Sequence, residues 1–145
     1  MRNLCILTMI LLSLGLVVNG CKRSEDSASA DWKLLQGLWS GSAPGLGEFK
    51  MTISGGKFDL KELYSDLYYK GTFTLNETTK PKQIDFLIKD SSIAQNKRVT
   101  ARAIYEIEND NFRFASYNPG DTARPSDFNE PGGFPIFDLT KQATQ

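Results

Sequence analysis

The segment from Asn118 to Gly133 holds the residues whose types and spacing best suit ligand binding. It is rich in turn-forming residues, and its 16 residues exceed the ~12–15 beyond which loops are usually functional or disordered. Arg124 lies between Asp121 and Asp127, and Phe128 follows. In one interpretation the segment is a flap over a cavity, and the planar guanidinium of Arg124 binds an anion. In the other, which we favour, the segment is a plug: Arg124 is satisfied by Asp127 or backbone carbonyls, and Phe128 fills the open end.

Residues for catalysis or metal binding are scarce. The chain contains no histidine, so it lacks the commonest general base and the commonest metal ligand. Ser40 has no neighbour suited to activate it as a nucleophile, and Glu106 and Glu108 are typical of a solvated strand face. The segment 109–111 lacks the oxygen ligands around a fixed glycine that a calcium loop needs. We therefore expect no enzyme activity, no catalytic residue, no metal and no cofactor.

The second candidate site is the interior of the domain. Trp39 and Tyr105 are its candidate ligand-binding residues, in addition to Arg124 and Phe128 of the segment above. The other bulky side chains expected there are Phe49, Met51, Phe58, Phe73, Phe86, Phe112 and Phe114. Each contributes roughly 1.5–3 kcal/mol when it is packed, which favours a filled interior. Small residues leave room only at Gly71, Ala101 and Ala103. A shallow pocket over the two alanines is the alternative.

The first 21 residues have the pattern of an export signal. Arg2 precedes an uncharged apolar run from Leu4 to Val18, an order typical of signal peptides. The run of about 15 residues is shorter than the ~20 that span a bilayer. Val18-Asn19-Gly20-Cys21 resembles the bacterial lipobox, which implies that residues 1–20 are removed and that Cys21 carries a diacylglyceryl thioether and an acylated amine. An ordinary cleaved signal with an incidental cysteine is the alternative.

Residues 21–30 are small, polar and charged, which predicts a flexible tether of roughly 15–20 Å before a single domain at 31–145. Cys5 leaves with the signal, so the domain has no thiol and no disulfide. Once Arg2 is removed, 16 basic and 17 acidic residues remain. The expected partners are a membrane, through lipid on Cys21, and a small apolar ligand or an envelope protein. A near-neutral surface makes nucleic acid an unsuitable partner.

Apolar and polar side chains alternate with a period of two along most of the domain, which is typical of antiparallel strands. Strands are predicted at about 37–43, 48–53, 58–61, 67–75, 84–88, 101–107, 112–114 and 134–141. A short helical turn at 31–35, capped by Asp31, should close one end. Gly37 is expected to permit close backbone approach, and Trp39 to supply the largest apolar surface. The predicted fold is all-β: an antiparallel up-and-down barrel of about eight strands, lipocalin-like, with a short N-terminal helical turn.

Four segments stand out, in this order along the chain: Leu35-Gln36-Gly37-Leu38-Trp39, a central segment made of 71–75 and 80–85, Ile104 to Asp110, and Arg124-Pro125-Ser126-Asp127-Phe128. Together they resemble the Planctomycetes-type lipocalin-like domain, a family without an assigned function. The resemblance spans nearly all of residues 34–141. It implies a lipocalin-like barrel and supplies no catalytic residue.

These features predict a lipid-anchored lipoprotein of the cell envelope whose barrel binds a small apolar or amphipathic molecule without catalysis. The first alternative is an envelope protein–protein interaction or structural module with a filled barrel, and the second is a hydrolase. Lys22 stands where an inner-membrane retention signal usually has Asp. This favours the outer membrane, facing the periplasm, over the inner membrane.

Overall fold

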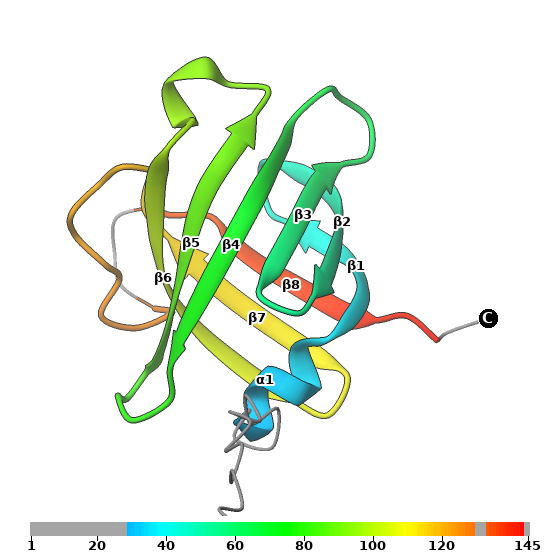
Figure 1. Cartoon of the computed structure of the whole chain (residues 1–145), viewed down its shortest axis with the longest axis vertical. Coiled ribbons are helices and arrows are strands. Elements are labelled where there is room, and N and C mark those ends of the chain that lie inside the picture. The colour runs from blue at the N-terminus through cyan, green and yellow to red at the C-terminus, as the bar shows by residue number, and fades with distance from the viewer. Residues whose placement is uncertain (1–28, 130–132, 144–145) are drawn as a thin grey trace, which may run out of the picture.

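The computed structural model describes residues 29–129 and 133–143, which form a closed eight-stranded antiparallel barrel with neighbours in chain order (Figure 1). The elements are α1 (Ala30–Leu35), β1 (Gly37–Ala43), β2 (Gly47–Ser54), β3 (Lys57–Glu62), β4 (Tyr68–Asn76), β5 (Lys82–Ser91), η2 (Ala94–Asn96), β6 (Val99–Glu108), β7 (Asn111–Ser116) and β8 (Ile136–Lys141). The all-β prediction is therefore confirmed. The predicted signal, Cys21 and all of the tether before Ser29 lie outside the described residues. No helix in the described ranges is long and apolar enough to cross a membrane.

Period-two alternation builds the interior. Along β2, the side chains of Phe49, Met51 and Ile53 are buried while their neighbours are exposed. Every bulky side chain expected in the interior is buried in one core cluster. Successive side chains of a strand point to opposite faces, so closing the sheet places one set inside and leaves the other in solvent.

The barrel closes where β1 pairs with β8, from Trp39 opposite Lys141 to Ser42 opposite Asp138. The last strand begins at Ile136, two residues later than predicted, because Pro135 has no N–H to donate to a strand ladder. Gly37, at the start of β1, has φ +123°, a conformation that suits glycine. Gly37 thus allows the chain to turn at the start of β1. The close approach of two backbones that was expected at Gly37 occurs at Gly41, where a Cβ would overlap the Asp138 carbonyl of β8.

Helix α1 covers one end of the barrel. Leu35 is fully buried, and the Trp32 ring packs on Phe73 with ring centroids 4.9 Å apart, as expected for a closing turn. The predicted cap is wrong, however, because the Ser29 side chain accepts the hydrogen bond from the Trp32 N–H. Asp31 is the second residue of α1, and its carboxylate is buried against the Tyr105 hydroxyl inside the barrel.

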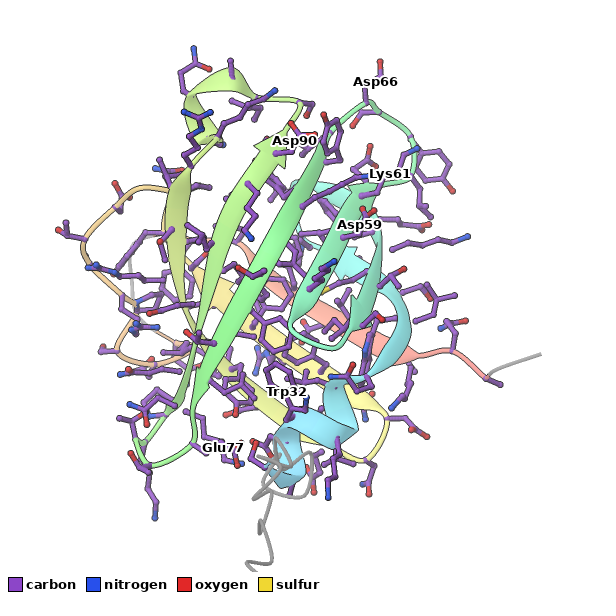
Figure 2. All side chains as sticks on the ribbon, viewed as in Figure 1. Trp32, Asp59, Lys61, Asp66, Glu77 and Asp90 are labelled. Atoms are coloured by element: carbon purple, nitrogen blue, oxygen red, sulfur yellow. The ribbon has the colours of Figure 1, made fainter. Side chains whose placement is uncertain are left out.

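The two ends of the barrel differ. The closed end carries α1 and the β2–β3, β4–β5 and β6–β7 turns; the open end carries the β1–β2, β3–β4 and β5–β6 connections (Figure 1). Trp32 and Glu77 mark the closed end and Asp66 the open end (Figure 2).

The long segment between β7 and β8 runs over the outside of the barrel. Phe128 packs on Ile104 and Ala115 in a second, smaller apolar cluster. Ile104 lies between Ala103 and Tyr105, which belong to the main core, so its side chain is on the outer face. The expectation that Phe128 fills the open end is therefore wrong: Phe128 covers an apolar patch on the barrel wall.

Candidate ligand-binding cavity

Side chains inside the barrel become smaller from the closed end toward the open end on three strands. At the closed end β1, β6 and β7 contribute Trp39, Tyr105 and Phe112, all fully buried. Toward the open end the inward residues of the same strands are Ala43, Ala101 and Ser116. Close packing thus fills one half of the barrel, while the other half lacks the side-chain volume to fill it.

A cavity of about 320 Å³ lies in that half. This volume is at the lower end of the range of roughly 300–1,000 Å³ found for small-molecule sites. Its walls include Met51, Leu60, Phe86, Ile88, Ala101 and Phe137. All of its lining residues are uncharged, and the polar ones, Tyr69, Ser116, Tyr117 and Asn118, come from the ends of strands or the start of the β7–β8 segment. The favoured expectation of a filled interior therefore describes only the closed half of the barrel. The alternative, a shallow pocket over the two alanines, agrees with the structure at Ala101 but not at Ala103, which is buried and does not line the cavity.

Four exposed apolar side chains surround the open end, and we call them the rim. Leu46 is on the β1–β2 connection, Leu63 and Tyr64 are on the β3–β4 connection, and Ile93 precedes η2. Their exposed fractions are 49%, 38%, 81% and 39%. Leu46 and Ile93 also line the cavity, so the rim joins the cavity through these two residues. The sequence analysis missed these residues, although large apolar side chains in turns are the signal that would have found them.

The structure does not bring the four predicted ligand-binding residues together at this cavity. Trp39 and Tyr105 are fully buried in the filled half, where the Trp39 indole N–H donates to the Leu35 carbonyl at 2.8 Å. Neither residue lines the cavity. Both act as packing beneath α1, because at the closed end no space remains beside them.

Arg124 and Phe128 lie on the outer wall. The Arg124 guanidinium donates to the Ala103 carbonyl at 2.6 Å and pairs with the Asp85 carboxylate at 2.6 Å. Backbone carbonyls satisfy Arg124, as the plug interpretation expected, but its carboxylate partner is Asp85 rather than Asp127. The planar fork is occupied by the protein itself, so the structure gives no support to Arg124 as an anion receptor.

A polar cluster lies under α1 at the closed end. The Asp31 carboxylate accepts hydrogen bonds from the Tyr105 hydroxyl and from the Lys82 ammonium, each at 2.7 Å. Burial raises the pKa of the Tyr105 phenol, and the hydrogen bond to Asp31 and the charge of Glu77 raise it further. The phenol therefore stays protonated and acts as a donor. With α1 above it and the packed core below, this cluster holds the helix in place.

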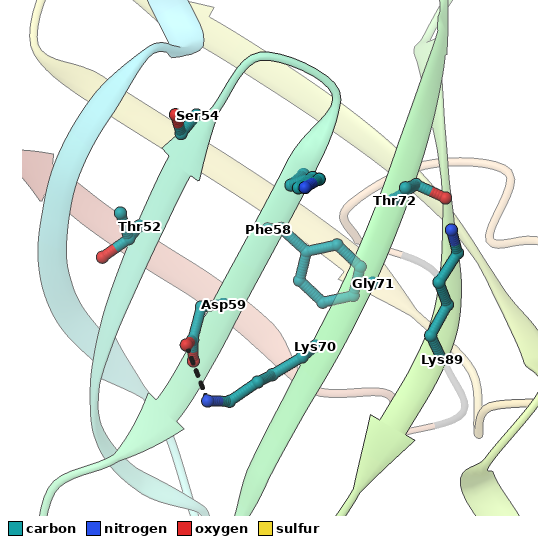
Figure 3. A pocket seen from close by; sticks show the side chains of 9 residues that line it. Thr52, Ser54, Phe58, Asp59, Lys70, Gly71, Thr72 and Lys89 are labelled. Atoms are coloured by element: carbon teal, nitrogen blue, oxygen red, sulfur yellow. Dashed lines mark ion pairs between the residues drawn. The ribbon is translucent and has the colours of Figure 1, made fainter.

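A second hollow lies on the outer wall between β2 and β5, around Gly71 (Figure 3). The Phe58 ring is its floor, while Lys57, Lys70 and Lys89 stand around it. Gly71 does not leave the room expected from the sequence, because a Cβ there would overlap the Leu87 carbonyl of β5. The Lys70 ammonium pairs with Asp59 at 3.1 Å, and both side chains are about half exposed. Exposed pairs of this kind contribute little energy, so this hollow offers a ligand only weak polar contacts on the outer wall. The interior cavity, which is enclosed by apolar side chains, is the stronger candidate site.

Within the described ranges, no three acidic, cysteine or histidine side chains gather as metal ligands would. Comparison with family models, with curated proteins and with solved structures gives no match to this chain. The fold and the cavity are thus the observations from which a function can be argued.

Proposed function

We propose that this protein is a lipid-anchored envelope lipoprotein whose barrel binds one small apolar or amphipathic molecule. The observation that carries the proposal is the cavity of about 320 Å³ at the open end, with its uncharged lining. A methylene group has nearly the same volume as a water molecule in the liquid, ~30 Å³, so the cavity accommodates on the order of ten methylene groups. A single medium-length acyl chain fits this volume better than a two-chain lipid.

The lining supports binding without catalysis. It contains no carboxylate, histidine, lysine or arginine, so the residue types that most often activate a nucleophile are not among its lining. Its polar groups gather toward the mouth, where the polar end of an amphipath would remain in contact with water. The proposed family, the Planctomycetes-type lipocalin-like domains, agrees with this architecture.

The proposed anchor enters at the end opposite the cavity. The described chain begins at Ser29 beside α1, so lipid on Cys21 would attach the barrel by its closed end. With the barrel upright on its anchor, the cavity would face away from that membrane. The predicted tether of residues 21–30, up to ~33 Å long when extended, would also let the barrel turn its open end toward it.

Filling the cavity tests the binding function. In the chain from Lys22 to Gln145, which contains every described strand and helix, we expect Ala101→Phe to weaken binding of the apolar fluorophore N-phenyl-1-naphthylamine by at least about tenfold, or ~1.4 kcal/mol. Fluorescence titration measures this, with displacement by dodecanoic acid as the competing readout. The control Thr74→Phe adds the same ring on the exposed face of β4 and should bind normally.

Two results would refute the binding function: no fluorophore uptake by the unmodified barrel, or equal affinity for both variants. Ala101→Leu serves if the larger side chain disturbs folding. A protein that instead purifies natively without extractable lipid and crosslinks to an envelope protein would support the interaction-module alternative.

The anchor has its own test. When the full chain is expressed in a bacterium supplied with labelled palmitate, we expect the protein to incorporate label and Cys21→Ser to abolish it, because the thioether requires this sulfur. Cys5→Ser, a cysteine within the predicted signal, should leave labelling intact. Label that persists in Cys21→Ser contradicts the proposed anchor.

A further inference from the structure

We propose that the rim is a membrane-docking surface through which a single-chain amphipath passes from a lipid bilayer into the cavity. This inference rests on the proposed binding function and adds the source and route of the ligand. Its occupant is a lipid surface: the rim touches lipid, and the chain of one lipid molecule enters between the rim residues.

The placement of the rim residues carries the inference. Seven large apolar side chains are exposed in the described ranges, and four of them form the rim. Burying a leucine side chain contributes roughly 1.5–3 kcal/mol. Exposing the four rim side chains to water is therefore unfavourable, and contact with a lipid surface would be favourable. Tyr64, the most exposed of the seven, is a residue type enriched where membranes meet water.

The β3–β4 connection is built to display its apolar residues. The Tyr64 N–H donates to the Glu62 carboxylate at 3.0 Å, and the Leu63 N–H donates to the Glu48 carbonyl at 2.8 Å. Glu62 is itself buried, and the Glu48 carboxylate accepts a hydrogen bond from the Tyr64 hydroxyl at 3.4 Å, so both carboxylates beside these residues are engaged by the protein itself. These bonds hold the backbone of Leu63 and Tyr64 in place, and both side chains are exposed.

Continuity between rim and cavity selects lipid as the partner. Leu46 and Ile93 belong to both surfaces, so an acyl chain could move from bilayer to cavity without crossing water. The charges at this end are of both signs: Lys97 is paired with Asp90 at 3.0 Å, and exposed Asp66 and Arg98 lie on the β3–β4 and β5–β6 connections. They form no patch of a single sign that would recruit a charged protein partner. Apolar rim side chains that lead into an uncharged, mostly apolar cavity are complementary to a lipid chain.

The test separates docking from binding. Vesicles of phosphatidylethanolamine and phosphatidylglycerol in a 7:3 ratio, loaded with dansyl-undecanoic acid, are mixed with the chain from Lys22 to Gln145. We expect Leu63→Ser with Tyr64→Ser to slow transfer of the probe to the protein, and to reduce flotation with vesicles, by at least about tenfold, the factor expected if the membrane buries one leucine side chain. Its affinity for N-phenyl-1-naphthylamine in vesicle-free solution should change less than about twofold.

The chain offers a matched control. Leu34 and Leu38, each 42% exposed, belong to α1 and the start of β1 at the closed end; the pair Leu34→Ser and Leu38→Ser should transfer and float normally. The cavity variant Ala101→Phe should float with vesicles normally but take up at least about tenfold less probe. Transfer that is insensitive to the rim substitutions overturns the docking inference and leaves binding standing. Self-association through the rim, detected by sedimentation, overturns it as well, whereas absence of uptake by the unmodified barrel defeats the binding function itself.

Discussion

Replacing Asp31 with Ala should lower the free energy of unfolding by about 2–3 kcal/mol. The carboxylate is almost completely buried and accepts two hydrogen bonds, from the Tyr105 hydroxyl and the Lys82 ammonium. Without it the fully buried hydroxyl of Tyr105 loses its acceptor, which costs about 1–3 kcal/mol. Lys82 is 39% exposed and can turn to water, so its contribution is the smaller one. Urea denaturation followed by circular dichroism measures the change.

A double-variant cycle identifies the cause. If the stranded hydroxyl is responsible, Tyr105→Phe in the Asp31→Ala background should restore part of the loss, with a coupling energy of about 0.5–3 kcal/mol between the two sites. Asp59→Ala removes another carboxylate from a lysine pair, but from an exposed one, and should change stability by less than about 0.5 kcal/mol. Equal losses from Asp31→Ala and Asp59→Ala would show that burial of the cluster is unimportant.

The sequence predicted the barrel well because period-two alternation is a local signal with a global consequence. A residue such as Met51, flanked by Lys50 and Thr52, has one apolar face to bury whatever its partner strand is. Tertiary partners are different: Asp31 fits an N-cap by its residue type, and nothing in its neighbours reveals that Tyr105, 74 residues later, provides the donor.

The course of the β7–β8 segment was misjudged for a reason that the sequence does contain. Ala103, Ile104 and Tyr105 are consecutive apolar residues, so this strand has something to bury on both faces. Phe128 covers the outer one. Counting apolar residues that break the alternation would have placed the segment on the wall rather than over the mouth.

The cavity could be predicted only in part. Ala101 marked the region where side chains are small. An empty volume, however, forms only if the inward side chains of three strands become smaller toward the same end of the barrel. Predicting that requires the register of these strands and the position of the closing seam. The rim depends on the same information. Leu46 and Ile93 are 47 residues apart in the chain, and closure of the barrel makes them neighbours at one opening.

Closure itself leads to the second large expected effect: Gly41→Ala should destabilise the barrel by on the order of 3 kcal/mol. A Cβ atom added at Gly41 would overlap the Asp138 carbonyl group and crowd the Leu139 Cα of β8. These are backbone atoms in the seam pairing, so no side chain can move aside to relieve the overlap. The added methyl group must separate β1 from β8.

The position of the damage distinguishes this mechanism from a general loss of packing. Amide hydrogen exchange should accelerate first in β1 and β8, while β4 and β5, on the far side of the barrel, stay protected until global unfolding. The adjacent Ser42→Ala, on the exposed face of the same strand, should leave the seam intact and stability within about 0.5 kcal/mol. If Gly41→Ala keeps both its stability and the protection of β8, the two strands do not approach as closely as described. Closure of the barrel at that seam, on which both the cavity and the rim depend, would then need to be reconsidered.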